Sequence, residues 1–438
     1  MVVVGTGLIG GSLALAWRNA GLRVWGIDAS QAVVEKALAA GVVEDGAAWQ
    51  RPQPLEPGPA ACRLLEAADA VILAAPVPAI CALLPGLFPL LRPGTLVLDT
   101  GSTKSGVLDS AWQAARTLAR ARPHPGGGGE IPAAGPVFVG GHPLAGSEEQ
   151  GVEAADPYLF QNSYFVLVPG PGVCVDPDSP WPAEPPPALR LAVGLVCAAG
   201  ALPVVADAAD HDTLVALVSH LPHLAAAAVV QTVFSEDAGA VSFASKAALA
   251  AGGFRDLTRV ASSDPRLWRE ILVANRAAIL PALRRLEANL ERLAALLGGG
   301  GPEAQADAAG LEEFLRRARW VRGQLPLRRK GLLGHREELV VWVPDRPGEI
   351  HALTGHLARA HINIQDLEVL RVREHEGGSI LLAFSEPGQG SRAAEILRQQ
   401  GYAVRCREDL REGRPTHGQM ADSASDSALA GGDPGAGR

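Results

Sequence analysis

Short apolar runs alternate with longer amphipathic segments over the first half of the chain. The runs lie at 2–4, 22–27, 70–74, 95–98, 137–139, 163–168 and 202–205. Fully apolar strands that alternate with helices are typical of a parallel sheet covered on both faces. The pattern therefore predicts an α/β domain over residues 1–206.

The pattern changes at residue 207. Residues 207–297 carry almost no strand signal and show long apolar stripes at the helical period of 3.6 residues. A glycine-rich run at 298–301 interrupts the stripes, which resume to about residue 325. We expect an all-α domain over residues 207–330.

The last third of the chain returns to a mixed pattern. Residues 338–407 follow the order strand, helix, strand, strand, helix, strand, which predicts a small α+β ferredoxin-like domain over 337–412. Residues 413–438 are rich in glycine, alanine, aspartate and serine and hold scarcely any apolar anchor. We expect this last segment to be a disordered tail.

The first apolar run ends in a glycine-rich turn that opens a helical segment. Residues 5–10 read GTGLIG, which is G-x-G-x-x-G in a strand–turn–helix context. In a Rossmann fold the first glycine makes the turn, the second admits the pyrophosphate, and the third allows close helix–strand packing. We therefore predict a Rossmann dinucleotide-binding domain whose cofactor contacts are Gly5, Thr6, Gly7, Leu8, Ile9 and Gly10.

Asp28 ends the second apolar run, 21 residues after Gly7 (28 − 7). A carboxylate at about this spacing bonds the ribose 2′-hydroxyl of NAD. Residues 29–31 hold no Arg or Lys, so a 2′-phosphate would meet an unpaired negative charge. The sequence therefore predicts NAD rather than NADP.

Composition narrows the class of protein. Of 438 residues 47% are hydrophobic and 20% charged, and the net charge of −8 disfavours nucleic acid and anionic membranes as partners. No continuous apolar run approaches the ~20 residues of a membrane span, and we recognise no targeting signal. The five cysteines form no C-x-x-C pair, so neither a disulfide framework nor a metal site is indicated. We expect a cytoplasmic protein.

Two polar side chains follow apolar runs at the expected carboxyl edge of the sheet, where ligands of open α/β folds bind. Ser102 comes shortly after the run at 95–98, and His142 follows two glycines after the run at 137–139. Because Pro143 favours extended backbone before it, we expect a tight loop at the end of the strand to present His142. Histidine exchanges protons near neutral pH, although a structural His-Pro turn has the same sequence.

The helical region carries its own candidates. His220 and His223 are three residues apart and share a helix face if the helix continues through Pro222. Residues 252–259 read GGFRDLTR and suggest a glycine-opened loop with two guanidinium groups, which suit bidentate binding of carboxylates. Histidine pairs and arginines are also common on solvated helix faces.

Together these segments resemble the prephenate dehydrogenase family over about residues 1–297. The shared motifs are GTGLIG at 5–10, D-x-G-S-x-K at 99–104, GGHP-x-AGSE at 140–148, SHLPH at 219–223 and GGF-x-D-x-TR at 252–259. The histidine motifs are specific together, whereas many enzymes share the glycine turn. Residues 338–407 resemble an ACT domain, an amino-acid-sensing module.

The resemblance implies an NAD-dependent oxidative decarboxylation of prephenate to 4-hydroxyphenylpyruvate, in tyrosine biosynthesis, by a homodimer. It implies that His142 and Ser102 are catalytic, with His142 accepting the proton of the substrate's ring hydroxyl. The residues implied to bind substrate are Arg259, His223, His220, Glu148, Trp268 and Gly252.

Three alternatives stay open. Arogenate, which has an amino group in place of the side-chain keto group, would undergo the same chemistry. A β-hydroxyacid dehydrogenase needs a catalytic lysine on a helix of its second domain, but Lys246 is the only lysine in 207–297 and lacks that family's surrounding pattern. A non-catalytic NAD and amino-acid sensor would not need His142 or Ser102.

The resemblance to an ACT domain also implies an effector. Asp345 and Gly348 before a helix, and Asn363 before the next strand, match the positions where such domains bind an amino acid. End-product logic makes tyrosine the expected effector. A structural turn followed by an asparagine would have the same sequence.

Overall fold

The structure is a computed structural model that forms two compact units, Met1–Gly331 and Leu332–Arg438. It describes residues 1–49, 57–121, 135–146, 149–170, 173, 185–235, 242–298, 304–324, 337–344, 346–373 and 377–406. The expected tail at 413–438 lies outside the described residues. The predicted domain boundaries, at residue 206 for the α/β domain and at residue 330 for the all-α domain, stay predictions.

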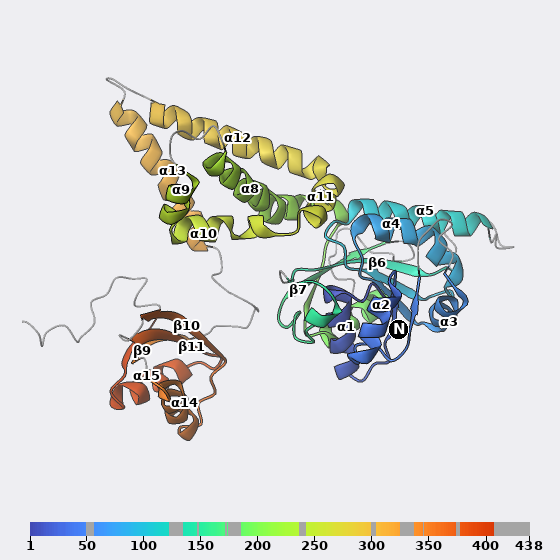
Figure 1. Cartoon of the computed structure of the whole chain (residues 1–438), viewed down its shortest axis with the longest axis horizontal. Coiled ribbons are helices and arrows are strands. Elements are labelled where there is room, and N and C mark those ends of the chain that lie inside the picture. The colour runs from blue at the N-terminus through green and yellow to red at the C-terminus, as the bar shows by residue number, and fades with distance from the viewer. Residues whose placement is uncertain are drawn as a thin grey trace, which may run out of the picture. The chain divides into compact units, whose positions relative to one another are not determined.

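An eight-stranded sheet forms the centre of the first unit (Figure 1). Its strands are β1 (Val2–Val4), β2 (Trp25–Asp28), β3 (Gly46–Ala48), β4 (Ala70–Leu73), β5 (Leu96–Asp99), β6 (Val137–Pro143), β7 (Tyr164–Pro169) and β8 (Leu202–Val205). The order β3-β2-β1-β4-β5-β6 is that of a doubly wound Rossmann sheet, with β7 and β8 added beyond β6. The α/β Rossmann prediction is confirmed.

The sheet is not wholly parallel. β7 pairs antiparallel with β6, and β8 pairs parallel with β7, so the last two strands run opposite to the first six. The expectation of an all-parallel sheet was therefore wrong at this end. The sequence analysis also missed the short β3, whose three residues carry too little pattern to be recognised.

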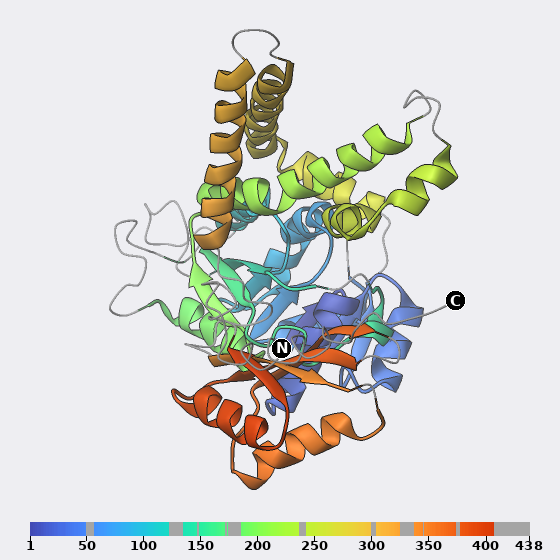
Figure 2. The same cartoon turned by 90° about the vertical axis from the view of Figure 1, so that its left-hand side faces the viewer.

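Helices cover both faces of this sheet (Figures 1 and 2). They are α1 (Leu8–Asn19), α2 (Gln31–Ala39), α3 (Pro59–Ala67), α4 (Val77–Leu87), α5 (Ser105–Ala121) and α6 (Pro187–Ala198). Alternate strand residues divide between two cores, since Val2 and Val4 pack with α3, α4 and α5 whereas Val3 packs with α1 and α6. This division follows from the two-residue period of side chains along a strand.

From residue 208 the described chain of the first unit is helical, as predicted. The helices are α7 (Ala208–Val215), the π-helical turn η3 (Ala216–His220), α8 (Leu221–Phe234), α9 (Phe243–Leu249), α10 (Gly252–Thr258), η4 (Arg259–Ser262), α11 (Pro265–Ala274), α12 (Arg276–Gly298) and α13 (Ala304–Gln324). α12 and α13 lie side by side (Figures 1 and 2).

The stretch Ala208–Phe234 is long and apolar enough to cross a membrane by length and composition alone. It carries Asp212, His211, His220 and His223, which are all buried within the folded unit. These inward-facing ionisable side chains favour a helix of a folded domain over a membrane span.

The second unit is an antiparallel sheet with two helices, in the strand order β10-β11-β9-β12. Its elements are β9 (Glu337–Val343), α14 (Glu349–Arg359), β10 (Asp366–Arg373), β11 (Gly377–Phe384), α15 (Gln389–Gln399) and β12 (Ala403–Cys406). Leu353, Leu357 and Leu397 of the helices pack on Val341 and Leu382 of the sheet. The ferredoxin-like prediction is confirmed.

Candidate functional site

The glycine turn joins β1 to α1 where the strand order reverses between β1 and β4. Gly10 is required by packing, because a Cβ there would lie 1.9 Å from the carbonyl oxygen of Gly5. Gly7 has open space, since a Cβ there would meet nothing within 4 Å. The side chains of Leu8 and Ile9 are partly exposed and Thr6 is buried. This leaves the start of α1 accessible to an anion.

Asp28 closes β2 and turns toward the same loop. Its carboxylate accepts hydrogen bonds from the backbone N–H of Thr6 at 2.9 Å and of Ser30 at 3.0 Å. These bonds fix the carboxylate beside the glycine turn. The arrangement fits NAD, in which the adenosine ribose has a free 2′-hydroxyl to donate to such a carboxylate.

His142 lies within β6 and not in a loop beyond it, so that expectation was wrong. The parallel pairing with β5 ends at Val139, but β6 continues because Gly140–Pro143 pair with β7, with His142 opposite Val166. The strand therefore extends past the carboxyl end of β5. The imidazole still stands at that edge of the sheet, now held by strand pairing.

The two glycines before His142 are required by close approach. A Cβ on Gly141 would lie 2.3 Å from the carbonyl oxygen of Asp99, and one on Gly140 would lie 3.2 Å from Cδ of Lys104. Side chains alternate along the strand, so Gly140 and His142 share the face that carries Lys104.

Lys104 and Asp99 form a fully buried ion pair that joins β5 to β6. The Lys104 ammonium also donates to the carbonyl oxygen of Gly141 at 2.7 Å, and Asp99 accepts from the N–H of Gly141 at 3.0 Å and of Gly101 at 2.7 Å. Burial lowers the pKa of Lys104, which its Asp99 partner opposes. The pair therefore fixes the backbone at Gly101, next to Ser102, and at Gly141, next to His142.

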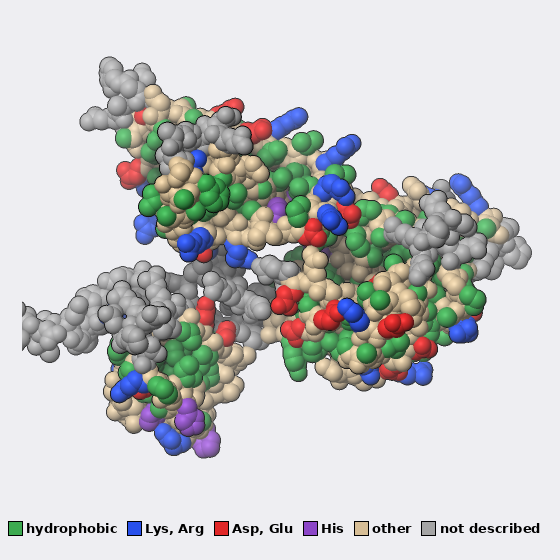
Figure 3. Space-filling view, in the orientation of Figure 1, with side chains coloured by type: hydrophobic (Ala, Val, Ile, Leu, Met, Phe, Trp, Pro, Cys, Tyr) green, Lys and Arg blue, Asp and Glu red, His purple; other side chains and the backbone are tan. Residues whose placement is uncertain are grey.

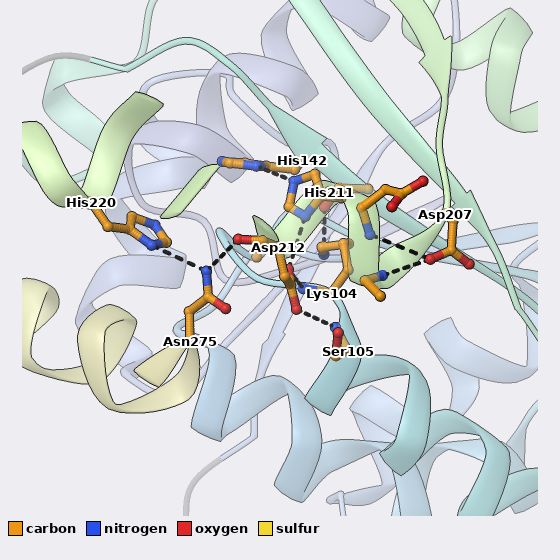
Figure 4. Close-up of polar contacts among 12 residues, drawn as sticks. Lys104, Ser105, His142, Asp207, His211, Asp212, His220 and Asn275 are labelled. Atoms are coloured by element: carbon orange, nitrogen blue, oxygen red, sulfur yellow. Dashed lines mark hydrogen bonds and ion pairs between the residues drawn. The ribbon is translucent and has the colours of Figure 1, made fainter. Parts of the chain in front are cut away.

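A chain of polar contacts runs from His142 into the helical region (Figure 4). Nδ1 of His142 lies 2.9 Å from Nε2 of His211, whose Nδ1 lies 2.9 Å from Oδ1 of Asp212. The Asp212 carboxylate also accepts from the N–H of Lys104 at 2.7 Å and of Ser105 at 2.9 Å. Asp207 accepts from the N–H of Ala209 at 2.8 Å and so caps α7, the helix that carries His211 and Asp212.

The electrostatics of this chain keep His142 neutral. Burial, followed by the positive charge of Lys104 and the neighbouring His211 and His220, holds the pKa of His142 well below 6.5. Burial opposes ionisation of Asp212, yet hydrogen bonds from His211 and from Ser105 and Lys104 lower its pKa to about 2. A neutral imidazole at this edge can accept a proton.

The helix continues through Pro222, so His220 and His223 share a helix face as their spacing predicted, and both rings meet Trp268 of α11. The His223 ring stacks on Trp268 with centroids 3.5 Å apart, and the His220 ring meets it edge-on at 6.0 Å. Burial lowers the pKa of His220 to about 4 and also lowers that of His223. Nδ1 of His223 is buried and has no hydrogen-bond partner among the described residues.

Asn275 fixes the orientation of His220. Its Nδ2 donates to the carbonyl oxygen of Asp212 at 2.8 Å and lies 3.2 Å from Nδ1 of His220. Because that amide nitrogen can only donate, Nδ1 of His220 accepts and Nε2 carries the proton. His220 therefore offers a donor to an anionic ligand.

The predicted glycine-opened loop at 252–259 is helical. Gly252 begins α10, and Arg259 opens the 3₁₀ turn η4, which packs against α8. Gly252 and Arg259 are exposed. Glu148 lies outside the described residues.

Ser102 lies three residues past the end of β5, in the turn that leads to α5, and is partly exposed. In the second unit Gly348 has a left-handed backbone, φ 91°, directly before α14. Asn363 is exposed between α14 and β10, and Asp345 lies outside the described residues.

Three buried polar residues of the site were missed from sequence, namely His211, Asp212 and Asn275. The available signal was the His211–Asp212 pair in the polar run at 210–213, directly before a long apolar stretch. Lys104 was noticed only as part of a motif, because nothing in sequence shows that its ammonium is buried.

Comparisons with known proteins agree with this geometry. Residues 13–172 match the family model described as the nucleotide-binding domain of prephenate dehydrogenase, and residues 207–317 match the one described as its dimerization domain. A prephenate dehydrogenase of Bacillus subtilis is 32% identical over 401 residues, which cover 91% of this chain and 95% of that relative.

Two solved structures are similar to the first unit in fold. The prephenate dehydrogenase of A. aeolicus, in complex with hydroxyphenyl propionate and NAD+, has a TM-score of 0.58 and 25% identity, covering 74% of this chain and 97% of that one. The arogenate dehydrogenase of Synechocystis has a TM-score of 0.55 and 28% identity, covering 74% of this chain and 98% of that one.

Proposed function

The chain belongs to the prephenate dehydrogenase family, and from this premise we propose that it oxidises and decarboxylates prephenate to 4-hydroxyphenylpyruvate with reduction of NAD+. The observation that carries the proposal is the neutral His142 at the carboxyl edge of a dinucleotide-binding sheet, facing the imidazoles of the helical region. This combination supplies a proton acceptor beside a nicotinamide site.

The residues around the glycine turn fit NAD. The start of α1 would receive the pyrophosphate, with Gly7 open to it, and Asp28 would accept from the ribose hydroxyl. When bound, NAD+ supplies the acceptor for the hydride. Asp28 stands where a 2′-phosphate would be repelled, so we propose NAD over NADP.

His142 would accept the proton of the ring hydroxyl while hydride leaves the ring carbon that carries this hydroxyl. Positive charge develops at that carbon, and removal of the hydroxyl proton stabilises it, which as general-base help is worth ~10²–10⁴-fold. The bond to the ring carboxylate then breaks, its electron pair enters the ring as carbon dioxide leaves, and the phenolate oxygen recovers a proton. Ser102 would hydrogen-bond the same hydroxyl.

The helical region would hold the substrate's carboxylates. His220 offers an Nε2–H donor, and His223 offers a buried Nδ1 without a partner in the described residues. Trp268 walls the space beside both rings. The family motifs suggest three further contacts, which are Arg259 at the start of η4, Glu148 and Gly252. An arginine fork suits a carboxylate.

The direct test is NADH formation by the purified full chain with NAD+ and prephenate, with 4-hydroxyphenylpyruvate identified as product. Arogenate is assayed beside prephenate, because a structural relative is an arogenate dehydrogenase. A higher kcat/KM with prephenate is expected. A higher value with arogenate would change the assigned substrate, and no turnover of either would refute the proposal.

We also propose a homodimer formed by the helical region, in a protein of the cytoplasm. Hydrophobic side chains gather over α9 and α10 (Figure 3), where Phe243 is 71%, Leu249 82% and Leu257 58% exposed. An exposed apolar patch marks an association site. Light scattering should give twice the chain mass. Phe243→Glu with Leu249→Glu should give monomers, whereas Leu38→Glu on α2 should not.

Tyrosine is the proposed effector of the second unit. The left-handed Gly348 before α14 leaves backbone open to an amino acid, and the exposed Asn363 supplies a polar partner near it in sequence. Coupling of ~1–3 kcal/mol between effector and active sites is typical. Asn363→Ala should weaken inhibition by tyrosine, whereas Gln365→Ala, on the same connection, should not. Equal inhibition in both variants and the native chain would remove Asn363 from the effector site.

A further inference from the structure

A second imidazole stands behind His142. His211, on α7, is 2% exposed and uses both ring nitrogens, one toward Nδ1 of His142 and the other toward Oδ1 of Asp212. The family motifs quoted above include neither His211 nor Asp212. Their contacts determine which nitrogen of His142 can accept a proton.

The ionised carboxylate of Asp212 determines which atoms donate and which accept along this chain of hydrogen bonds. Its carboxylate is ionised at neutral pH and already receives the N–H groups of Lys104 and Ser105. An ionised carboxylate only accepts. Nδ1 of His211 must therefore carry a proton and donate a hydrogen bond to Asp212.

A neutral imidazole has one donor and one acceptor nitrogen. With Nδ1 of His211 protonated, its Nε2 is the acceptor, and the partner across 2.9 Å, Nδ1 of His142, must donate. The remaining lone pair of His142 is then on Nε2. That is the one ring nitrogen of His142 left for a ligand.

We infer that His211 and Asp212 are positioning residues that hold His142 in the tautomer whose Nε2 accepts the substrate proton. The inference rests on the proposed function, in which His142 receives that proton. Without His211, the His142 ring is free to adopt the other tautomer, which presents an N–H to the hydroxyl and cannot act as the base.

A purely structural role for Asp212 must be separated from this one. Its carboxylate bonds the first N–H groups of α5, and its backbone oxygen accepts from Asn275. Substitutions at His211 leave all of these bonds in place. They therefore test the tautomer without removing the helix cap.

The first experiment compares two substitutions of His211 in the full chain, with NAD+ and prephenate. His211→Leu removes both hydrogen bonds and is expected to lower kcat about 10²-fold, the lower end of general-base help, with KM changed less than about twofold. His211→Gln keeps a donor toward Asp212 and an acceptor toward His142, so kcat should stay within about tenfold of native. NAD+ binding by both variants confirms that they fold.

Native turnover tests the proposed function separately. If the native chain turns over prephenate and His211→Leu keeps near-native kcat, the inference fails while the proposed function stands. Equal large losses in His211→Leu and His211→Gln would also overturn it, because bond direction would then be irrelevant.

The second experiment uses the pH profile. The charged and titratable groups that face His142 are Lys104, His211, Asp212 and His220, and Lys104 is paired with Asp99. Among them only Asp212 raises the pKa of His142. Neutral His142 is the active form, so Asp212→Asn should lower that pKa further and move the acid limb of kcat/KM to lower pH.

Asp207→Ala is the matched control for a structural effect. It removes the carboxylate that caps α7, the helix that carries His211, and should lower Tm while leaving the acid limb in place. An acid limb that stays in place in Asp212→Asn, or moves to higher pH, would overturn the inference.

Discussion

The two halves of the candidate site are built differently. On the α7 side, Asp99, Lys104, His211 and Asp212 are buried and hydrogen-bonded to one another or to backbone. On the α10 side, neither α9, α10 nor η4 buries a residue in the described chain. The half that would do the proton chemistry is assembled within one chain, whereas Arg259, one of the proposed substrate contacts, lies at an open apolar face.

The difference follows from what each half must do. A base has to be held in one place and one tautomer, and buried hydrogen bonds to fixed backbone provide that. A substrate-binding surface has to open and close around its ligand, and local opening costs less free energy where few residues are buried. Substitutions in the two halves should therefore affect different quantities.

His142→Asn should have the largest effect. Its amide cannot accept a proton at neutral pH, so kcat should fall by ~10²–10⁴-fold while NAD+ binding stays near native. Steady-state kinetics and an NAD+ titration measure both quantities. A variant with near-native kcat would remove His142 from the proton transfer and place the chemistry elsewhere.

Lys104→Met tests how much the buried half contributes to the free energy of unfolding. Removing one partner of the fully buried pair leaves the Asp99 charge uncompensated and should lower the free energy of unfolding by about 3–5 kcal/mol in a urea titration. Leu38→Ala on α2, which is 38% exposed and outside the proposed dimer face, should cost less than about 0.5 kcal/mol. A loss below about 1 kcal/mol in Lys104→Met would mean that the Asp99 charge is compensated without the ammonium.

Arg259→Lys tests the open half. An ammonium cannot reproduce the two parallel hydrogen bonds of a guanidinium to a carboxylate, so KM for prephenate should rise about tenfold with kcat little changed. Arg255→Lys, on the neighbouring α10, is the control and should change KM less. A larger effect at Arg255 would transfer the carboxylate contact to that residue.

The smallest effect concerns pH between about 8 and 6.5. Neutral His142 is the active form and its pKa lies well below 6.5, so kcat/KM should be flat through this range and fall only at lower pH. Rate measurements across overlapping buffers check this. A decline centred near 6.5 would mean that the His142 ring is more solvated than the structure shows.

Local pattern was enough to predict the Rossmann half, the helical region and the ferredoxin-like unit. The glycine turn, Asp28 and the His220–His223 pair all depend on spacing along one element, which the sequence displays directly. β6 was misjudged beyond Val139 because its continuation depends on β7, which begins 21 residues after Pro143 (164 − 143). A partner strand that far away leaves no trace in the local pattern.

The polar network was less predictable still. His211 and Asp212 lie near the start of α7 and Asn275 directly follows α11, where polar residues are common. Only the contacts of Asp212 with Lys104, of His211 with His142 and of Asn275 with Asp212 make them a network. The segment at 252–259 was read as a loop because paired glycines usually end helices. Here they are the first two residues of α10, which begins at Gly252.

The shared strand β6 also bears on how this enzyme can vary in length. A strand turns each successive side chain to the opposite face, so one residue inserted between Val139 and His142 would point the imidazole away from His211 and Lys104. One residue added before Val137 shifts nothing in the pairing with β5 and β7. A change in chain length before Val137 therefore leaves the direction of the His142 side chain unchanged, whereas the number of residues from Val139 to His142 is fixed.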